Sequence, residues 1–230
     1  MAGQIGDLLL RPESFFAGRA GEPESLKVPA VIAITGAIIS AAAAYLTLGI
    51  TMELFGNVPE MAGMKPILVI VGVVIAFFTF LVLWGLIVPG VFYLISMAFS
   101  GTGAFKRTIL FSLYGLVPII IGSFLSLLVS LYYIPMIQVP TLTAIQDPAA
   151  IEAARRQLMH DTAFSELGLI TAVLSGIFLL WSANLWIFCL KQARSLTLKQ
   201  AAITVLIPVI VGIIFILYTT VAGIPGFGGV

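Results

Sequence analysis

The stretch Phe99–Pro118, FSGTGAFKRTILFSLYGLVP, decides the fold because it predicts a hinge between two apolar segments of the chain. Ser100–Gly103 predict a turn, since these small residues offer no apolar surface to bury. Phe105, Lys106 and Arg107 follow, an aromatic ring and two cations of the kind found where a membrane helix meets the headgroups. An apolar segment then runs to the proline, which removes a backbone donor and should bend a helix.

The composition indicates a chain that lies in a lipid bilayer. Of its 230 residues, 60% are hydrophobic and only 9% are charged, whereas soluble domains carry about 25% charged residues. The net charge of +1 excludes a general electrostatic affinity for nucleic acid. The single cysteine, Cys189, excludes an internal disulfide and a metal site built from cysteines alone.

Apolar runs long enough to cross a hydrocarbon core of roughly 30 Å recur along the chain. We therefore expect an all-α polytopic membrane protein, a bundle of five transmembrane helices preceded by a short amphipathic segment over residues 1–27. The membrane domain is expected over residues 28–222, followed by an uncharged, disordered tail at 223–230. The expected spans are residues 28–52, 66–88, 108–134, 167–190 and 201–222.

Prolines mark the expected hinges of the bundle. The second apolar run continues past residue 88 to Ala98, which is too long for one straight span. Pro89 within it predicts a kink or a continuation along the membrane interface. In the third span, Pro118 lies four residues after Tyr114 and predicts a bend there.

The one long polar connection lies between the third and fourth spans. Asp147 followed by a proline predicts the start of a short helix, because aspartate is a favoured N-cap and proline a favoured first helical residue. Glu152 in that helix has the spacing to pair with either of the two arginines that follow it, Arg155 or Arg156.

Residues 1–27 predict an amphipathic segment because they combine acidic residues with a broken apolar pattern. At helical spacing, Phe15 and Phe16 belong to an apolar face that could lie in the headgroup zone, with Arg11 facing phosphate. The same face could instead pack on the cytosolic ends of the spans, and the two arrangements are compatible.

Basic residues predict the orientation. They are concentrated on one side of the expected bundle, so the positive-inside rule places the N-terminus in the cytosol and the C-terminus outside. Five spans require these opposite ends. The expected cytosolic set is Arg11, Arg19, Lys27, Lys106, Arg107, Lys191, Arg194 and Lys199, and the opposite set is Lys65, Arg155 and Arg156.

The sequence contains no recognisable catalytic motif or metal-binding pattern. No ionisable residue lies in the middle of an expected span, which disfavours an ion-coupled transporter or proton pump. His160 is the one histidine, whereas a metal site needs several ligands. No hydrolase, metalloprotease or phosphate-loop motif occurs. We therefore expect no catalytic residue, no metal and no cofactor.

A few polar residues do lie within the expected spans, chiefly Ser126, Ser182 and Asn184. One explanation is hydrogen bonding between helices, since polar groups in hydrocarbon need partners. The other is a polar path for a lipid headgroup or a small solute. Hydrogen bonding is the favoured explanation.

Three stretches resemble the Yip domain family, the Ypt/Rab-interacting five-span membrane proteins. LLLRPESFF, Leu8–Phe16, is similar to the family's Arg-Pro followed by paired aromatics. SGTGAFKRTILFSLYGLVP, Ser100–Pro118, is similar to its turn, basic residues and spaced Tyr and Pro, here Tyr114 and Pro118. LKQARSLTLKQAAITVLIP, Leu190–Pro208, is similar to its basic turn into the fifth span.

The resemblance covers nearly the whole chain and implies the five-span fold. About 27 residues precede the first span, where eukaryotic members have a long cytosolic region, and the connection at 135–166 is longer than the family's. The chain therefore resembles a short prokaryotic-type member, and the expectation of Rab binding is weakened.

Two classes of function are left open. The leading one is a non-enzymatic scaffold, membrane-organising or of trafficking type, that associates with membrane lipids, anionic ones included, or forms homo- or hetero-oligomers with membrane proteins. The alternative is a transporter or translocator of a lipid or small neutral solute through a path lined by polar residues of spans three and four. A membrane-embedded enzyme is disfavoured, because acid and base groups are missing.

The Lys106–Arg107 pair, with Phe105 as an interfacial anchor, is the leading candidate binding site. Cations at the start of a helix oppose its dipole, so something must favour them there. Orientation alone is one explanation, because cytosolic turns collect lysine and arginine. The other is an anionic partner, either lipid phosphate or the acidic face of a soluble protein.

Overall fold

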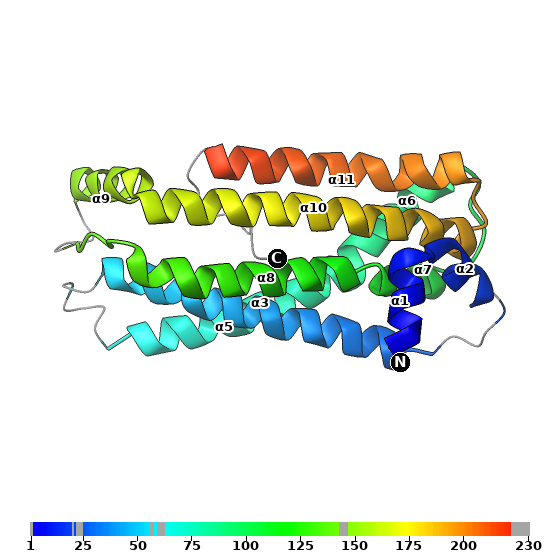
Figure 1. Ribbon diagram of the computed structural model, residues 1–230, viewed down its shortest axis with the longest axis horizontal. Coiled ribbons are helices and arrows are strands. Elements are labelled where there is room, and N and C mark those ends of the chain that lie inside the picture. The colour runs from blue at the N-terminus through cyan, green and yellow to red at the C-terminus, as the bar shows by residue number, and fades with distance from the viewer. Residues whose placement is uncertain are drawn as a thin grey trace.

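The architecture is helical throughout the residues that the computed structural model describes, which are 2–19, 21, 25–55, 58, 63–142 and 147–221 (Figure 1). Five helices among them are long and apolar enough to cross a membrane, which confirms the expected all-α, five-span fold. The expected tail at 223–230 lies outside the described residues. The five helices are α3 (Lys27–Leu54), the continuous helix Lys65–Met97, α8 (Val117–Tyr133) with its extension to Met136, α10 (Thr162–Ala193) and α11 (Leu198–Val221).

Helix α10 is the element around which the others pack. It contacts α8, α11 and the short helices α7 (Phe105–Tyr114) and α2 (Pro12–Gly18). Helix α3 contacts α8 and α5 (Lys65–Val82). The long helices lie side by side along the long axis of the molecule (Figure 1). The buried core follows α10 from Leu179 to Ala193.

The outer surfaces of the long helices are apolar. Large exposed side chains recur on the helix that starts at Lys65, such as Ile70 and Phe78, and on α11, such as Ile210 and Phe215. An aqueous protein rarely exposes apolar patches of this extent. These surfaces fit the acyl chains of a bilayer.

The second span is one unbroken helix, so it does not end near residue 88 as the sequence suggested. It consists of α5 (Lys65–Val82), a π-helical turn at Leu83–Ile87 and α6 (Val88–Met97). The π turn directly precedes Pro89, which lacks a backbone N–H and therefore removes one hydrogen bond from the interior of this continuous helix. A helix in lipid keeps its backbone hydrogen bonds, so local widening replaces a break.

The third apolar segment forms two helices instead of the single bent helix expected over residues 108–134. Helix α7 ends at Tyr114 and α8 begins at Val117, so Pro118 lies in the first turn of α8. Gly115 lies at the interruption, and a Cβ atom there would come within 2.3 Å of the Trp186 indole. Close contact with α10 therefore accompanies the interruption.

Two aspartates cap the helices of the long connection and determine the residues at which these helices begin. The Asp147 side chain accepts hydrogen bonds from the first amides of α9 (Pro148–His160), as the sequence predicts. Helix α10 begins five residues earlier than expected because Asp161 caps it, accepting a hydrogen bond from the Phe164 amide at 2.8 Å.

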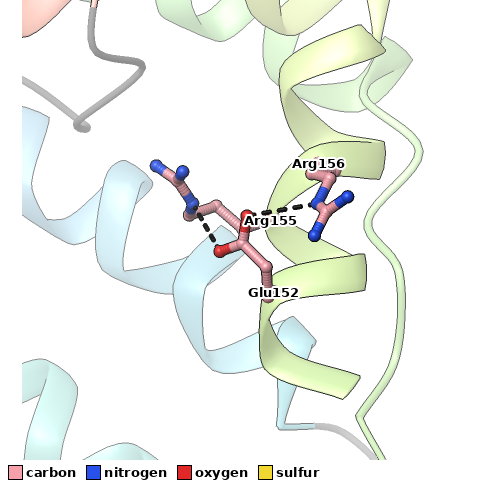
Figure 2. Close-up of polar contacts among 3 residues, drawn as sticks. All are labelled: Glu152, Arg155 and Arg156. Carbon is pink, nitrogen blue, oxygen red and sulfur yellow. Dashed lines mark hydrogen bonds and ion pairs between the residues drawn. The ribbon is translucent and has the colours of Figure 1, made fainter. Parts of the chain in front are cut away.

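On α9, Glu152 pairs with both candidate arginines and not with one alone. Its two carboxylate oxygens accept hydrogen bonds from Arg155 Nε at 3.1 Å and from Arg156 Nε at 3.2 Å (Figure 2). The three side chains are partly to largely exposed, so the pairs stabilise the helix only modestly.

The helices α1 (Ala2–Leu10) and α2 lie at the same end of the bundle as the turn between α6 and α7 and the turn between α10 and α11 (Figure 1). We call this the basic end, because these segments carry most of the basic residues of the chain. Helix α11 starts at the basic end and runs toward the opposite end, where α9 lies (Figure 1). The basic residues of the basic end, apart from Lys27 at the start of α3, are Arg11, Arg19, Lys106, Arg107, Lys191, Arg194 and Lys199.

Candidate functional site

Arg194 is buried at the basic end and organises it, although the sequence identified it only as an orientation signal. Its side chain is 2% exposed. Its Nε donates a hydrogen bond to Ser96 Oγ at 2.9 Å, and its terminal nitrogens donate to the carbonyls of Gly101, at 2.6 Å, and of Gly103. The guanidinium also lies 4.1 Å from the centre of the Tyr93 ring. One side chain thus joins the end of α6, the following turn and the end of α10.

The turn that Arg194 holds has a strained backbone. Ser100 has a φ of 56° and Gly103 a φ of 105°, both in the left-handed region. A Cβ atom at Gly103 would lie 2.5 Å from the Ala193 carbonyl oxygen, so only glycine fits. The Thr102 amide donates to the Arg194 carbonyl at 3.0 Å. The sequence predicts this turn from its small residues, but the arginine that fixes it lies more than ninety residues away.

Phe15 and Phe16 are buried, so they do not present their rings to the headgroup zone. The Phe16 ring centre lies 5.6 Å from that of Phe111, and the Phe15 ring centre lies 5.4 Å from that of Tyr114. The guanidinium of Arg19 lies 4.1 Å from the centre of the Phe15 ring. The sequence left open whether this apolar face lies in the headgroup zone or packs on the ends of the spans, and these two rings pack on the bundle.

A salt bridge adds a second link between the N-terminal helices and α10. Lys191 Nζ lies 2.5 Å from Glu13 Oε1, and both side chains remain partly exposed. Arg11, which precedes Glu13 by two residues, is exposed. The N-terminal segment is therefore held on the bundle by aromatic packing and by an ion pair.

The Lys106–Arg107 pair occupies the first turn of α7, directly after the turn that Arg194 holds. Lys106 is exposed, while the Arg107 guanidinium lies 5.1 Å from the centre of the Phe111 ring. Phe105 is half-buried and packs edge-on against Tyr93, with ring centres 5.2 Å apart. Phe105 is thus attached to α6 and fixes the start of the helix that carries the two cations.

The interruption between α7 and α8 is bridged by Trp186 of α10. Its Nε1 donates a hydrogen bond to the Ser112 carbonyl at 2.9 Å. Its indole also stacks on Trp84 with ring centres 5.8 Å apart, and packs edge-on against Phe92 at 5.3 Å. Tyr114, expected at a hinge, is buried in the aromatic cluster at the end of α7.

The polar residues of the spans do not form one group. Ser126 and Ser182 are buried, and within the described part of the chain their hydroxyls have no hydrogen-bond partner. Asn184 is instead exposed on α10. Neither of two hollows on the described surface is lined by Tyr114 or by these serines. The hydrogen bonds between helices that the sequence favoured are therefore not formed by these two hydroxyls within the described residues.

The described hollows have distinct surroundings. One is an apolar depression between α3, α5 and α8, lined by residues that include Ala41, Tyr45 and Leu131. The other lies between the N-terminal helices and α10 and is lined by Arg11 and Asn184 among others. Among the described residues, no three histidine, cysteine, aspartate or glutamate side chains are grouped as a metal site requires.

The five apolar helices and the braced basic end define a multi-span membrane protein. The model of the Yip1 domain family matches residues 6–219, and the chain belongs to this family. An uncharacterised protein of Methanocaldococcus jannaschii is 32% identical over 126 residues, which make up 55% of this chain and 87% of that protein. No solved structure is significantly similar to the chain.

Proposed function

We propose that this Yip1-domain protein is a non-enzymatic scaffold that organises membranes by binding anionic lipid headgroups at its basic end. The observation that carries the proposal is the rigid support of the Lys106–Arg107 pair. The pair begins a helix whose start is fixed by the buried Arg194 and by the packing of Phe105 on Tyr93. A surface used only as an orientation signal needs positive charge but no such support.

The charge arrangement favours an anionic ligand. Two cations in the first turn of α7 oppose the helix dipole, at a cost of about 0.3–1 kcal/mol each. An anionic membrane surface contributes about 1 kcal/mol per nearby cation, which offsets that cost. Ala104, the N-cap residue of α7, has no polar side chain to cap the helix, so a phosphate could accept hydrogen bonds from its first amides.

A double substitution tests the proposal. Lys106→Gln with Arg107→Gln should lower the affinity for anionic lipid by roughly tenfold to thirtyfold, as the loss of two contributions of about 1 kcal/mol implies. The measurement is the amount of acidic lipid that co-purifies with the protein, determined by lipid mass spectrometry. The matched control, Arg155→Gln with Arg156→Gln, removes the same charge from α9 at the opposite end and should leave the lipid content unchanged.

The result also separates binding from orientation. The orientation of both variants is followed with a reporter fused at Gln4. A double variant of the basic end with unchanged orientation and unchanged acidic lipid would show that the Lys106–Arg107 pair is an orientation signal only, and the proposal would be wrong.

A further inference from the structure

A groove of about 470 Å³ runs between the N-terminal helices and α10. Its wall on the N-terminal side is the segment Leu10–Ser14, which joins α1 to α2 and which we call the elbow. Its other wall is formed by Asn184 and Phe188 on one face of α10. The groove is lined by apolar residues, Leu10, Pro12 and Phe188, and by polar ones, Arg11, Glu13, Ser14 and Asn184.

The groove lies beside a spanning helix, and the depth of Asn184 can be estimated along it. Asn184 precedes Lys191 by seven residues, which corresponds to roughly 10 Å along the axis of α10. Lys191 carries a charge that belongs in the headgroup zone, so Asn184 lies near the boundary between headgroups and hydrocarbon. An exposed amide at that depth is within reach of a lipid headgroup and can hydrogen-bond to it.

The charges that line the groove leave one positive charge uncompensated. Glu13 is neutralised by its salt bridge to Lys191 of α10. Arg11 is exposed in the elbow and contributes the remaining charge. The groove is therefore complementary to a ligand that carries one negative charge.

The apolar surroundings of the groove continue toward the middle of the membrane. Leu10 is 80% exposed in the elbow, and Phe188 belongs to the α10 wall of the groove. Ile177 and Leu180 are also exposed on α10, seven and four residues before Asn184, so they share its face of the helix. This face offers a continuous apolar track that begins at the amide.

We propose that the groove binds one molecule of a singly anionic phospholipid. The phosphate lies between the Arg11 guanidinium and the Asn184 amide, and one acyl chain follows Phe188, Leu180 and Ile177 along α10. The inference rests on the proposed lipid association of this protein. It places a bound lipid on the side of the bundle, at a site separate from the Lys106–Arg107 pair.

Native mass spectrometry of the purified full chain, titrated with phosphatidylglycerol, tests the site. Asn184→Leu should weaken the first binding event by roughly tenfold, as expected for losing a hydrogen bond to a charged group. Asn184→Gln keeps an amide and should retain most of the affinity. The control is Thr79→Leu, which removes an exposed polar side chain from α5, away from the groove, and should bind as the wild type does.

Charge selectivity gives an independent measurement. The wild type should bind phosphatidylglycerol more tightly than zwitterionic phosphatidylcholine, and Arg11→Gln should remove that preference. Unchanged binding by Asn184→Leu, or an equal loss in Thr79→Leu, would overturn the proposed site. A change in oligomeric state by Asn184→Leu with unchanged lipid binding would also overturn it, because the face would then bind a second copy.

The two lipid proposals can be overturned independently of each other. If the Lys106–Arg107 double variant keeps its acidic lipid while Asn184→Leu loses it, the basic-end proposal is wrong and the groove stands. If the Lys106–Arg107 double variant loses its acidic lipid while Asn184→Leu keeps it, the groove proposal is wrong and the basic-end proposal stands.

Discussion

Arg194 Nε donates a hydrogen bond to the hydroxyl of Ser96 across 2.9 Å, which joins the last turn of α10 to the last turn of α6. The same guanidinium donates to two glycine carbonyls of the following turn. A buried cation is tolerated here because each of its three donor nitrogens meets an oxygen and its face meets an aromatic ring.

Substitution of this arginine should loosen the basic end. Arg194→Gln should lower the free energy of unfolding by roughly 3 kcal/mol or more, because one hydroxyl and two carbonyls lose a charged donor. Arg194→Lys should recover only part of the loss, since an ammonium cannot present the planar fork to all three oxygens. The measurement is thermal unfolding in detergent together with proteolysis of the turn at 98–104.

The control for this experiment is Arg156→Gln, in which the lost side chain is 70% exposed. Its effect should stay within about 0.5 kcal/mol, as for most surface substitutions. Equal stability of the Arg194 and Arg156 variants would show that the buried contacts contribute little.

Gly115→Ala should disturb the packing between α7, α8 and α10. The new methyl group would lie 2.3 Å from the Trp186 indole, so the ring must move and its hydrogen bond to the Ser112 carbonyl must weaken. We expect a destabilisation of about 1–3 kcal/mol, typical of an overpacked core. Thermal unfolding and a shift of the tryptophan emission to longer wavelength measure it.

Gly176→Ala is the matched control, because it lies on α10 like Trp186 but a Cβ atom there meets open space. Alanine is favoured over glycine within a helix by about 0.5–1 kcal/mol, so this variant should be slightly more stable than the wild type. Destabilisation of both variants to the same extent would exclude the indole contact as the cause.

Local signals in the sequence predict the parts of the fold that depend on near neighbours. Apolar runs predict the five spans, small residues predict the turn at Ser100–Gly103, and Asp147 predicts the start of α9. These features follow from hydrophobic length, backbone freedom and capping, which need no knowledge of distant residues.

Features that depend on contacts between distant segments could not be predicted in the same way. An amphipathic pattern shows that Phe15 and Phe16 avoid water, but lipid and protein are both apolar, so the pattern does not choose between them. The role of Arg194 depends on bringing α10 beside residues 98 positions earlier. Its signal in the sequence, an arginine after a long apolar run, also fits orientation alone.

The ion pairs of Glu152 predict a response of α9 to acid. The hydrogen bond and charge of Arg155, with a smaller contribution from Arg156, lower the pKa of the Glu152 carboxyl below its ordinary value of 4.5. Because this pKa is lowered by folding, the stabilisation is present above pH 4.5 and is lost as the pH falls through the lowered pKa.

Hydrogen exchange of residues 148–160, corrected for intrinsic exchange rates, measures this response. Protection of α9 should decrease slightly on acidification below pH 4.5 in the wild type. Glu152→Gln should already have the lower protection at neutral pH and should lack this acid-dependent step. A step of the same size in Glu152→Gln would assign the response to another group.

The basic end should face the cytosol, with the C-terminus on the other side of the membrane. The positive-inside rule gives this orientation, and labelling of single cysteines can test it because the native Cys189 is fully buried. In intact cells, an impermeant maleimide should label Ala153→Cys on α9 but should label Thr102→Cys, in the turn before α7, only after permeabilisation. Both positions are exposed, so a difference in labelling reports the side of the membrane.

Reporter fusions at Gln4 and Gly229 should give a cytosolic signal at the first position alone. Labelling of Thr102→Cys in intact cells with protection of Ala153→Cys would reverse the orientation and would remove the Lys106–Arg107 pair from the cytosolic leaflet.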